Sequence, residues 1–115
     1  MAGSERRVHP RVPLKLLVQF RLTDVDQFMR EHAVNLSIGG MFIATTEPRP
    51  IGVLVYLQFR VADGGTLIEG LGRVVHVNDP KTEEPGMGIE FVNLDEGSRE
   101  FIDAAIHARL ERATA

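Results

Sequence analysis

Three arginines stand close together near the start of the 115-residue chain: Arg6, Arg7 and Arg11, within the segment RRVHPR. A guanidinium group can donate two parallel hydrogen bonds to a phosphate, and the same planar fork matches the O6/N7 edge of guanine. Pro10 and Pro13 bias the residues before them away from the helical region, so this segment is expected to be extended. The segment could therefore bind a compact anionic group.

A second polar cluster lies in the segment NLSIGG, residues 35–40. The amide of Asn35 and the hydroxyl of Ser37 can both donate and accept hydrogen bonds. Because the two residues are two apart in an extended segment, their side chains are expected to project from one face. Gly39 and Gly40 would allow positive φ and a close approach of the backbone to a bound group. The alternative is an Asn/Ser/Gly turn between strands that needs no ligand.

The charge of the chain is unevenly distributed. The net charge is −3, whereas residues 1–15 hold four basic side chains and one acidic one, so the rest of the chain is clearly acidic. A short basic arm on an acidic body favours a compact anionic partner over DNA. An oligonucleotide-binding barrel would need aromatic stacking platforms, and the chain has one tyrosine and no tryptophan.

The sequence contains no arrangement typical of an enzyme. Ser37 lacks the preceding glycine of a nucleophile elbow. The four histidines have no metal-ligand spacing, and the absence of cysteine excludes thiolate metal sites and disulfides. Gly70 and Gly72 lack the third glycine of a dinucleotide fingerprint and instead suit a strand bend or close backbone approach. We therefore predict no catalysis, no metal and no cofactor.

No apolar run is long enough for a membrane helix, and no apolar segment follows the basic N-terminus as it would in a signal peptide. We therefore expect a cytoplasmic protein that does not insert into a membrane.

Alternating apolar residues predict strands through most of the chain. The predicted strands are residues 14–22, 28–36, 41–44, 53–61, 66–77 and 87–91. After Asp95, a predicted N-cap, apolar residues recur at helical spacing to about Arg112. These are Phe101, Ile102, Ala105, Ile106 and Leu110, and they are expected to pack on the sheet. The pattern predicts one mainly β domain, a small barrel or curled sheet closed by a C-terminal helix.

Together, these features resemble the PilZ domain family. The R-x-x-x-R arm precedes an N-x-S-x-x-G turn by about two dozen residues, and two such motifs in this order and fold pattern are fairly specific. The segment GMGIEF, residues 86–91, is similar to the glycine-rich sixth strand of the family. The resemblance runs from about Arg6 to about Leu110.

The resemblance implies a six-stranded antiparallel β-barrel with a C-terminal α-helix at residues 14–115, preceded by a flexible basic arm at residues 1–13. It also implies a receptor for cyclic di-GMP, a bacterial second messenger with two guanines and two phosphates. Arg7 and Arg11 would contact phosphate and guanine, Asn35 and Ser37 would read a guanine edge, and Gly40 would keep the turn tight. The expected ligand-binding residues are Arg6, Arg7, Arg11, Asn35, Ser37, Gly39 and Gly40.

Two residues bear on how the ligand would bind. Arg6 precedes the first motif arginine, which is similar to members that bind an intercalated pair of ligand molecules. Asn35 stands where many members have aspartate. Since an amide oxygen is a weaker partner than a carboxylate for the two donors of guanine, we expect a lower affinity.

We further expect the arm to become ordered on ligand binding and to pass this change to an unidentified downstream protein. The alternative is a PilZ-type adaptor that works through protein contacts and binds no nucleotide. The presence of both motif arginines counts against this adaptor.

Overall fold

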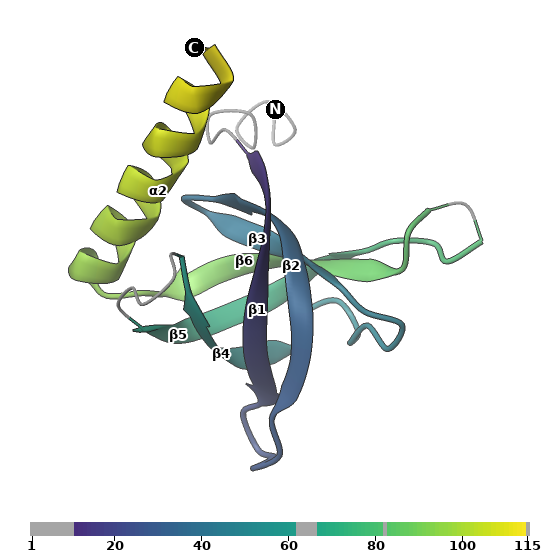
Figure 1. Cartoon of the computed structure of the whole chain (residues 1–115). Helices are drawn as coiled ribbons and strands as arrows, with labels where there is room; N and C mark the ends of the chain where they lie inside the picture. Colours follow the sequence, from purple (N-terminus) through teal and green to yellow (C-terminus); the bar gives the residue numbers. More distant parts are fainter. Residues whose placement is uncertain (1–10, 62–66, 82, 115) are drawn as a thin grey trace, which may run out of the picture.

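The computed structural model describes residues 11–61, 67–81 and 83–114. Arg6, Arg7 and most of the predicted basic arm lie outside this range, so the predictions made for them are not tested by the structure. Six strands and a helix are arranged as shown in Figure 1. They are β1 (Val12–Leu22), β2 (Met29–Ser37), β3 (Gly40–Ala44), β4 (Leu54–Arg60), β5 (Leu67–Val77), β6 (Gly86–Asn93) and α2 (Glu96–Thr114).

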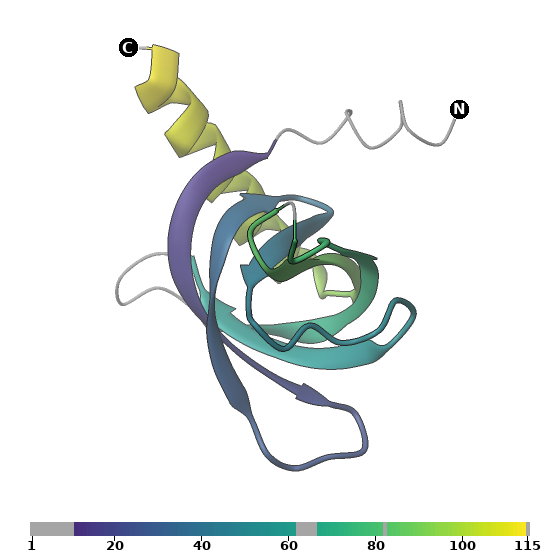
Figure 2. The same cartoon turned by 90° about the vertical axis from the view of Figure 1, so that its right-hand side faces the viewer.

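The strands form a closed barrel in the order β1-β2-β3-β6-β5-β4, and every neighbouring pair is antiparallel. Figure 2 shows the strands curving around a common centre. Alternate side chains of each strand fill that centre, as period-two patterning requires. The fully buried ones include Val18, Phe20, Leu36, Met41, Ile43, Leu57, Phe59, Ile68, Val74 and Ile89. The predicted six-stranded antiparallel barrel is confirmed.

The first strand begins at Val12, two residues before the predicted start. Val12 is buried and pairs with Leu36 of β2, so the strand continues toward the N-terminus past Pro13. Pro13 has no N–H for the ladder, and the register of β1 against β2 shifts between Pro13 and Leu16. The pairing therefore continues past a residue that usually ends a strand.

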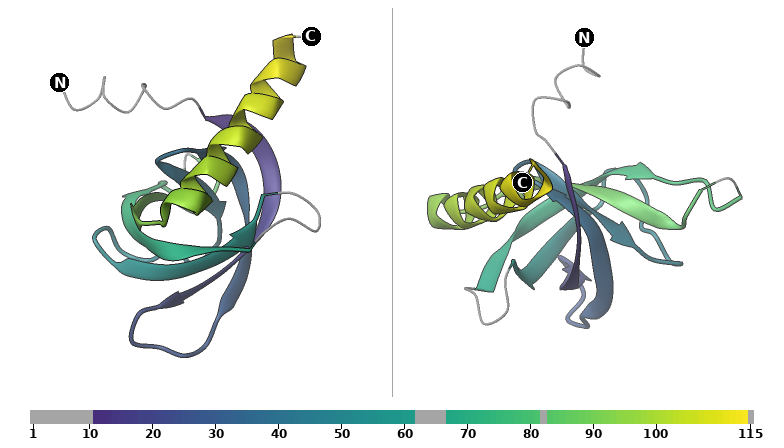
Figure 3. Two further views of the ribbon diagram at one scale, coloured as in Figure 1. Left: turned by 90° about the vertical axis from the view of Figure 1, so that its left-hand side faces the viewer. Right: turned by 45° about the horizontal axis from the view of Figure 1, so that its top comes forward.

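Helix α2 lies against β1 and β2 on one side of the barrel (Figure 3). Ile102 and Ile106 are buried against the barrel, whereas Phe101 and Leu110 are exposed. The prediction that all five apolar helix residues pack on the sheet was therefore too broad, because neighbouring positions such as 101 and 102 lie about 100° apart around a helix. Within the described residues, no helix is both long and apolar enough to cross a bilayer.

The N-cap of α2 is the one that the sequence predicted. The Asp95 carboxylate accepts a hydrogen bond of 2.7 Å from the backbone N–H of Ser98. This bond lowers the pKa of Asp95, because it stabilises the ionised form. The cap fixes where the helix begins after the last strand of the barrel.

Candidate functional site

A β-bulge near the end of β2 sets the direction of the polar motif. In the pairing of β2 with β3, Ala33 opposes Ile43 and Asn35 opposes Phe42, so Val34 is an extra residue. The bulge reverses the inward–outward alternation. As a result, the buried residues of this segment are Ala33 and Leu36, three apart rather than two. Asn35 is thereby placed on the outer surface of the barrel.

Ser37 is turned into the β2–β3 turn rather than toward solvent. Its hydroxyl oxygen accepts hydrogen bonds from the backbone N–H groups of Gly39 (3.2 Å) and Gly40 (3.1 Å) and donates one to the Gly40 carbonyl (3.3 Å). The side chain is 3% exposed. A serine hydroxyl has one donor and two acceptor sites, so the turn uses all of them.

Gly40 is needed because the backbone of β6 passes next to it. A Cβ at this position would overlap the carbonyl oxygen of Ile89. In addition, the Phe91 N–H donates to the Gly39 carbonyl at 2.8 Å, which ties the turn to β6. The expectation of positive φ at Gly39 and Gly40 is wrong, since among the described residues only Gly52 has one. The close approach at Gly40 is that of a neighbouring strand.

Arg11 joins the two sequence motifs. Its Nη1 donates a hydrogen bond of 2.7 Å to Oδ1 of Asn35, and both side chains are accessible. The antiparallel pairing of β1 with β2 accounts for this contact, since Pro13 directly opposes Asn35. One of the five N–H donors of the guanidinium is used in this way. The start of the barrel thus presents an arginine fork beside an amide.

A strip of positions that face away from the barrel interior continues from Asn35 across the barrel. Asn35 opposes Phe42 on β3, Phe42 opposes Gly88 on β6, and Gly88 opposes His76 on β5. Residues directly opposite in antiparallel strands share a face. The Phe42 ring lies so close to Gly86 that a Cβ there would overlap it. Gly86 and Gly88 are themselves buried, so the partly exposed ring of Phe42 beside the Asn35 amide is the surface on which a planar base could lie.

The sequence analysis missed this strip, because the register of β3, β5 and β6 decides which side chains are neighbours. The glycines of GMGIEF were its only visible signal. At the far end, Nε2 of His76 lies 2.7 Å from Oδ1 of Asn78. Among the described residues, no group of three histidine, aspartate or glutamate side chains could hold a metal ion.

Comparison with protein families gives a match to the model described as PilZ domain over residues 5–108. Comparison with curated proteins gives no match.

Several solved structures share the fold. The PilZ domain of YcgR from Escherichia coli with c-di-GMP has a TM-score of 0.72 and 18% identity, over 94% of each chain. The inhibitor of motility MotI/DgrA from Bacillus subtilis has a TM-score of 0.73 and 24% identity, over 90% of this chain and 51% of that one. This chain therefore spans about half the length of the Bacillus protein. The PilZ domain of CeSA from a cellulose-synthesizing bacterium has a TM-score of 0.62 and 13% identity, over 90% and 98%.

Proposed function

The chain belongs to the PilZ domain family, and we propose that it is a cyclic di-GMP receptor that holds the nucleotide between its N-terminal arm and the β2–β3 turn. The observation that carries this proposal is the 2.7 Å contact between Arg11 and Asn35. It brings together the two motifs that are separated in the sequence. The nucleotide in the similar E. coli PilZ structure supports the choice of ligand.

Arg11 has the geometry to bind the ligand while it stays anchored. With one N–H donated to Asn35, the guanidinium keeps further N–H donors for a phosphate or for the O6/N7 edge of guanine. Arg7 supplies the second fork and Arg6 a third cation, which suits an intercalated pair of ligand molecules. The arm then becomes ordered around the anion, because the ligand supplies the attraction that repelling cations lack.

Asn35 reads the base, and the turn holds Asn35 in place. Its oxygen accepts from Arg11 and has a second lone pair for a guanine donor, while its NH₂ group can donate. Ser37 and Gly40 act mainly by fixing the turn, in view of their hydrogen bonds and packing. We assign the platform under the base to the ring of Phe42, with Gly39 at its edge.

The protein acts in this proposal as a receptor and not as an enzyme, in the cytoplasm of a bacterium where the messenger is found. Ordering of the arm creates a new surface beside the ligand for a downstream protein. The alternative is a PilZ-type adaptor that binds no nucleotide, and the following experiment distinguishes the two.

Calorimetric titration with cyclic di-GMP tests the proposal, since it reports both affinity and stoichiometry. We expect saturable binding, and two ligand molecules per chain would identify the intercalated pair. Arg11→Ala should lose about 1.5–3 kcal/mol of binding free energy, the range for a hydrogen bond to a charged group. Arg11→Lys should also bind weakly, because the fork is lost.

Arg99→Ala is the matched control, since Arg99 is an exposed arginine on α2. It should titrate like the parent protein. A folded parent protein that binds no cyclic di-GMP would reject the receptor and favour the adaptor.

A further inference from the structure

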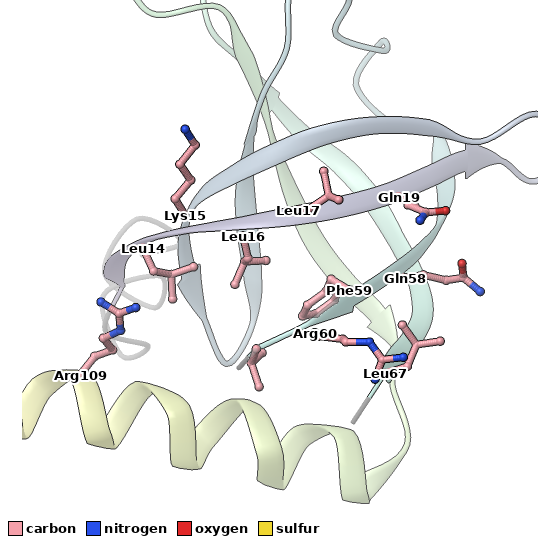
Figure 4. A pocket seen from close by; sticks show the side chains of 11 residues that line it. Leu14, Lys15, Leu16, Leu17, Gln19, Gln58, Phe59, Arg60, Leu67 and Arg109 are labelled. Atoms are coloured by element: carbon pink, nitrogen blue, oxygen red, sulfur yellow. The ribbon is translucent and has the colours of Figure 1, made fainter. Parts of the chain in front are cut away.

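The methionine sulfurs of the barrel differ in how accessible they are to solvent. Within the described residues, the methionines are Met29, Met41 and Met87. Met41 and Met87 are fully buried in the core, whereas Met29, the first residue of β2, is partly exposed. A cavity of about 490 Å³ between β1, the end of β4 and α2 has no sulfur among its described lining residues (Figure 4). Among the described thioethers, Met29 is therefore the one that a dissolved oxidant can reach.

An arginine side chain lies directly against the sulfur of Met29. Nη2 of Arg49 donates a hydrogen bond of 2.7 Å to Sδ of Met29. Nε of Arg49 is buried and has no hydrogen-bond partner among the described residues. Nε and Nη2 lie on the same edge of the planar guanidinium group, and a thioether sulfur is a weak acceptor. This edge of Arg49 therefore lacks a strong acceptor.

The β3–β4 connection holds Arg49 in a fixed place. Arg49 lies between Pro48 and Pro50, whose rings fix their own φ angles. The backbone N–H of Arg49 donates to Sδ of Met87 at 3.4 Å, and the carbonyl of Pro50 accepts from the N–H of Val53 at 3.2 Å. The guanidinium edge is thus positioned before a new acceptor forms, which lowers the entropy cost of binding one.

We propose that Met29 is a site of oxidation to methionine sulfoxide, and that the Nε and Nη2 edge of Arg49 binds the new oxygen. With hydrogen peroxide as the oxidant, a sulfur–oxygen bond forms and the oxygen–oxygen bond breaks. The sulfur loses two electrons, and the peroxide is reduced to water. The product side chain is polar, and its three rotatable bonds allow it to turn the oxygen toward both donors.

Oxidation at Met29 should have the opposite effect from oxidation in an apolar core. Sulfoxide formation usually disrupts a core, because it makes an apolar side chain polar. Beside Arg49, the same change supplies the acceptor that a buried donor lacks, and an unsatisfied buried donor costs free energy. The fold should therefore tolerate the sulfoxide or become more stable.

This site is separate from the proposed nucleotide site. Met29 begins β2 and Asn35 lies near its end, which places them about 20 Å apart along an extended strand. The proposal therefore does not depend on the binding of cyclic di-GMP.

Treatment of the full chain with hydrogen peroxide, without nucleotide, tests which sulfur reacts. Peptide mapping by mass spectrometry separates the methionines. Among the described ones, Met29 should take up one oxygen first, and Met41 and Met87 should react only on unfolding. The melting temperature of the oxidised protein should equal or exceed that of the reduced protein. In Met29→Leu, peroxide should leave the melting temperature unchanged.

Arg49→Leu removes the donors to the sulfoxide. In this variant, oxidation of Met29 should lower the melting temperature by about 5 °C, the shift for one lost hydrogen bond in a small domain. Arg30→Leu is the matched control, since Arg30 is the exposed neighbour of Met29 on β2. It should respond to oxidation like the parent protein. Each variant is compared with its own reduced form, so the direct effect of the substitution on stability cancels.

Met29→Gln tests the same contact without oxidation, because the amide oxygen of glutamine is a strong acceptor on a side chain of similar length. In the parent protein it should be at least as stable as Met29→Leu. In the Arg49→Leu background it should be the less stable of the two.

The proposal is overturned if Met41 or Met87 is oxidised before Met29. It is also overturned if oxidation lowers the melting temperature of the parent protein as much as that of Arg49→Leu, or if Met29→Gln is less stable than Met29→Leu in the parent protein.

Discussion

The two ends of β1 carry the same side chain in opposite situations. Arg21, near the end of the strand, lies over the rings of Tyr56 at 4.9 Å and Phe28 at 5.7 Å. Its Nη1 also donates to the carbonyls of Leu22, Thr23 and Val25 at 3.2–3.4 Å. Arg11, just before the strand, is exposed and makes one hydrogen bond among the described residues, to Asn35.

This difference shows that the residue type alone does not identify a binding group. At Arg21, the fold itself uses the charge and the planar face, and the arginine ties the β1–β2 loop to the barrel. At Arg11, the fold provides an anchor and leaves most of the fork for another partner. We therefore expect substitutions at the Arg21 end to lower stability and substitutions of Arg11 to lower ligand binding.

The largest effect should come from breaking the turn on which the Arg11 end depends. In Gly40→Ala, the new methyl group would overlap the Ile89 carbonyl of the adjacent strand. Backbone cannot easily move there, so we expect a loss of about 3 kcal/mol in the free energy of unfolding, the upper end for overpacking. Urea denaturation measures it.

Gly97→Ala is the control for the added methyl group, since its Cβ would meet only Asp95 Oδ1 at 3.5 Å, an ordinary contact. It should be neutral or slightly stabilising. If Gly40→Ala unfolds at the same urea concentration as the parent protein, the turn is not fixed by β6.

The comparison between the two arginines is tested directly by measuring both the free energy of unfolding and the affinity for cyclic di-GMP in each alanine variant. Arg21→Ala should lower the free energy of unfolding by about 1–2 kcal/mol through lost cation–π contacts and hydrogen bonds. Its affinity for cyclic di-GMP should stay that of the parent protein. Arg11→Ala should show the reverse, with unchanged unfolding and weakened binding. Two variants that both lose stability and keep binding would break the distinction.

Much of the fold could be predicted from the sequence, because burial on one face imposes a period of two on each strand. The six strands were found in this way, and the Asp95 cap was found from its position before apolar residues at helical spacing. The start of β1 was placed two residues too late, because Val12 and Pro13 lie inside the strand, next to a register shift. Pairing with Leu36 and Asn35 of β2 keeps Val12 and Pro13 in the strand, and the residues near Pro13 in the sequence do not indicate this pairing.

The candidate site was only partly predictable for a related reason. Arg11 and Asn35 were identified by type and spacing, but the inward direction of Ser37 depends on a competition between ligand and backbone that the sequence does not settle. The strip from Asn35 to His76 depends on bulges at Val34 and Val75, which shift the register by one residue. A single shift moves every following side chain to the other face.

Ser37 gives a second test of the comparison between Arg11 and Arg21. Its place in the motif predicts a ligand contact, as for Arg11, but its side chain bonds to backbone groups, as that of Arg21 does. Ser37→Ala leaves the N–H groups of Gly39 and Gly40 without their partner. We expect a loss of about 1–2 kcal/mol in stability, the cost of unsatisfied buried donors. Thermal unfolding and titration on the same sample separate the roles. Weaker binding with unchanged stability would assign the hydroxyl to the ligand.

A smaller effect is expected for Asn35→Asp. The new carboxylate would make a charge-assisted hydrogen bond with Arg11. For such an exposed pair, the free energy of unfolding should rise by about 0.2–1 kcal/mol. It could also accept both donors of a guanine edge. We expect the preference for cyclic di-GMP over its adenine counterpart to hold or to rise, as measured by parallel titrations. Equal binding of the two nucleotides by the parent protein would contradict base reading by Asn35.

The smallest effect concerns Asp95, whose carboxylate accepts a hydrogen bond from the backbone N–H of Ser98 at the start of α2. The hydrogen bond from Ser98 lowers the pKa of Asp95 below its ordinary value of 3.8. The ionised carboxylate therefore stabilises the fold above pH 3.8, and this contribution is lost as the pH falls through the lower pKa of the folded state. Asp95→Asn keeps a capping side chain without the charge. Its melting temperature should be slightly below that of the parent protein at neutral pH, and the gap should close at strongly acidic pH. Cyclic di-GMP binding should not change. A gap that persists in acid would show that the geometry of this cap, and not its charge, stabilises the fold.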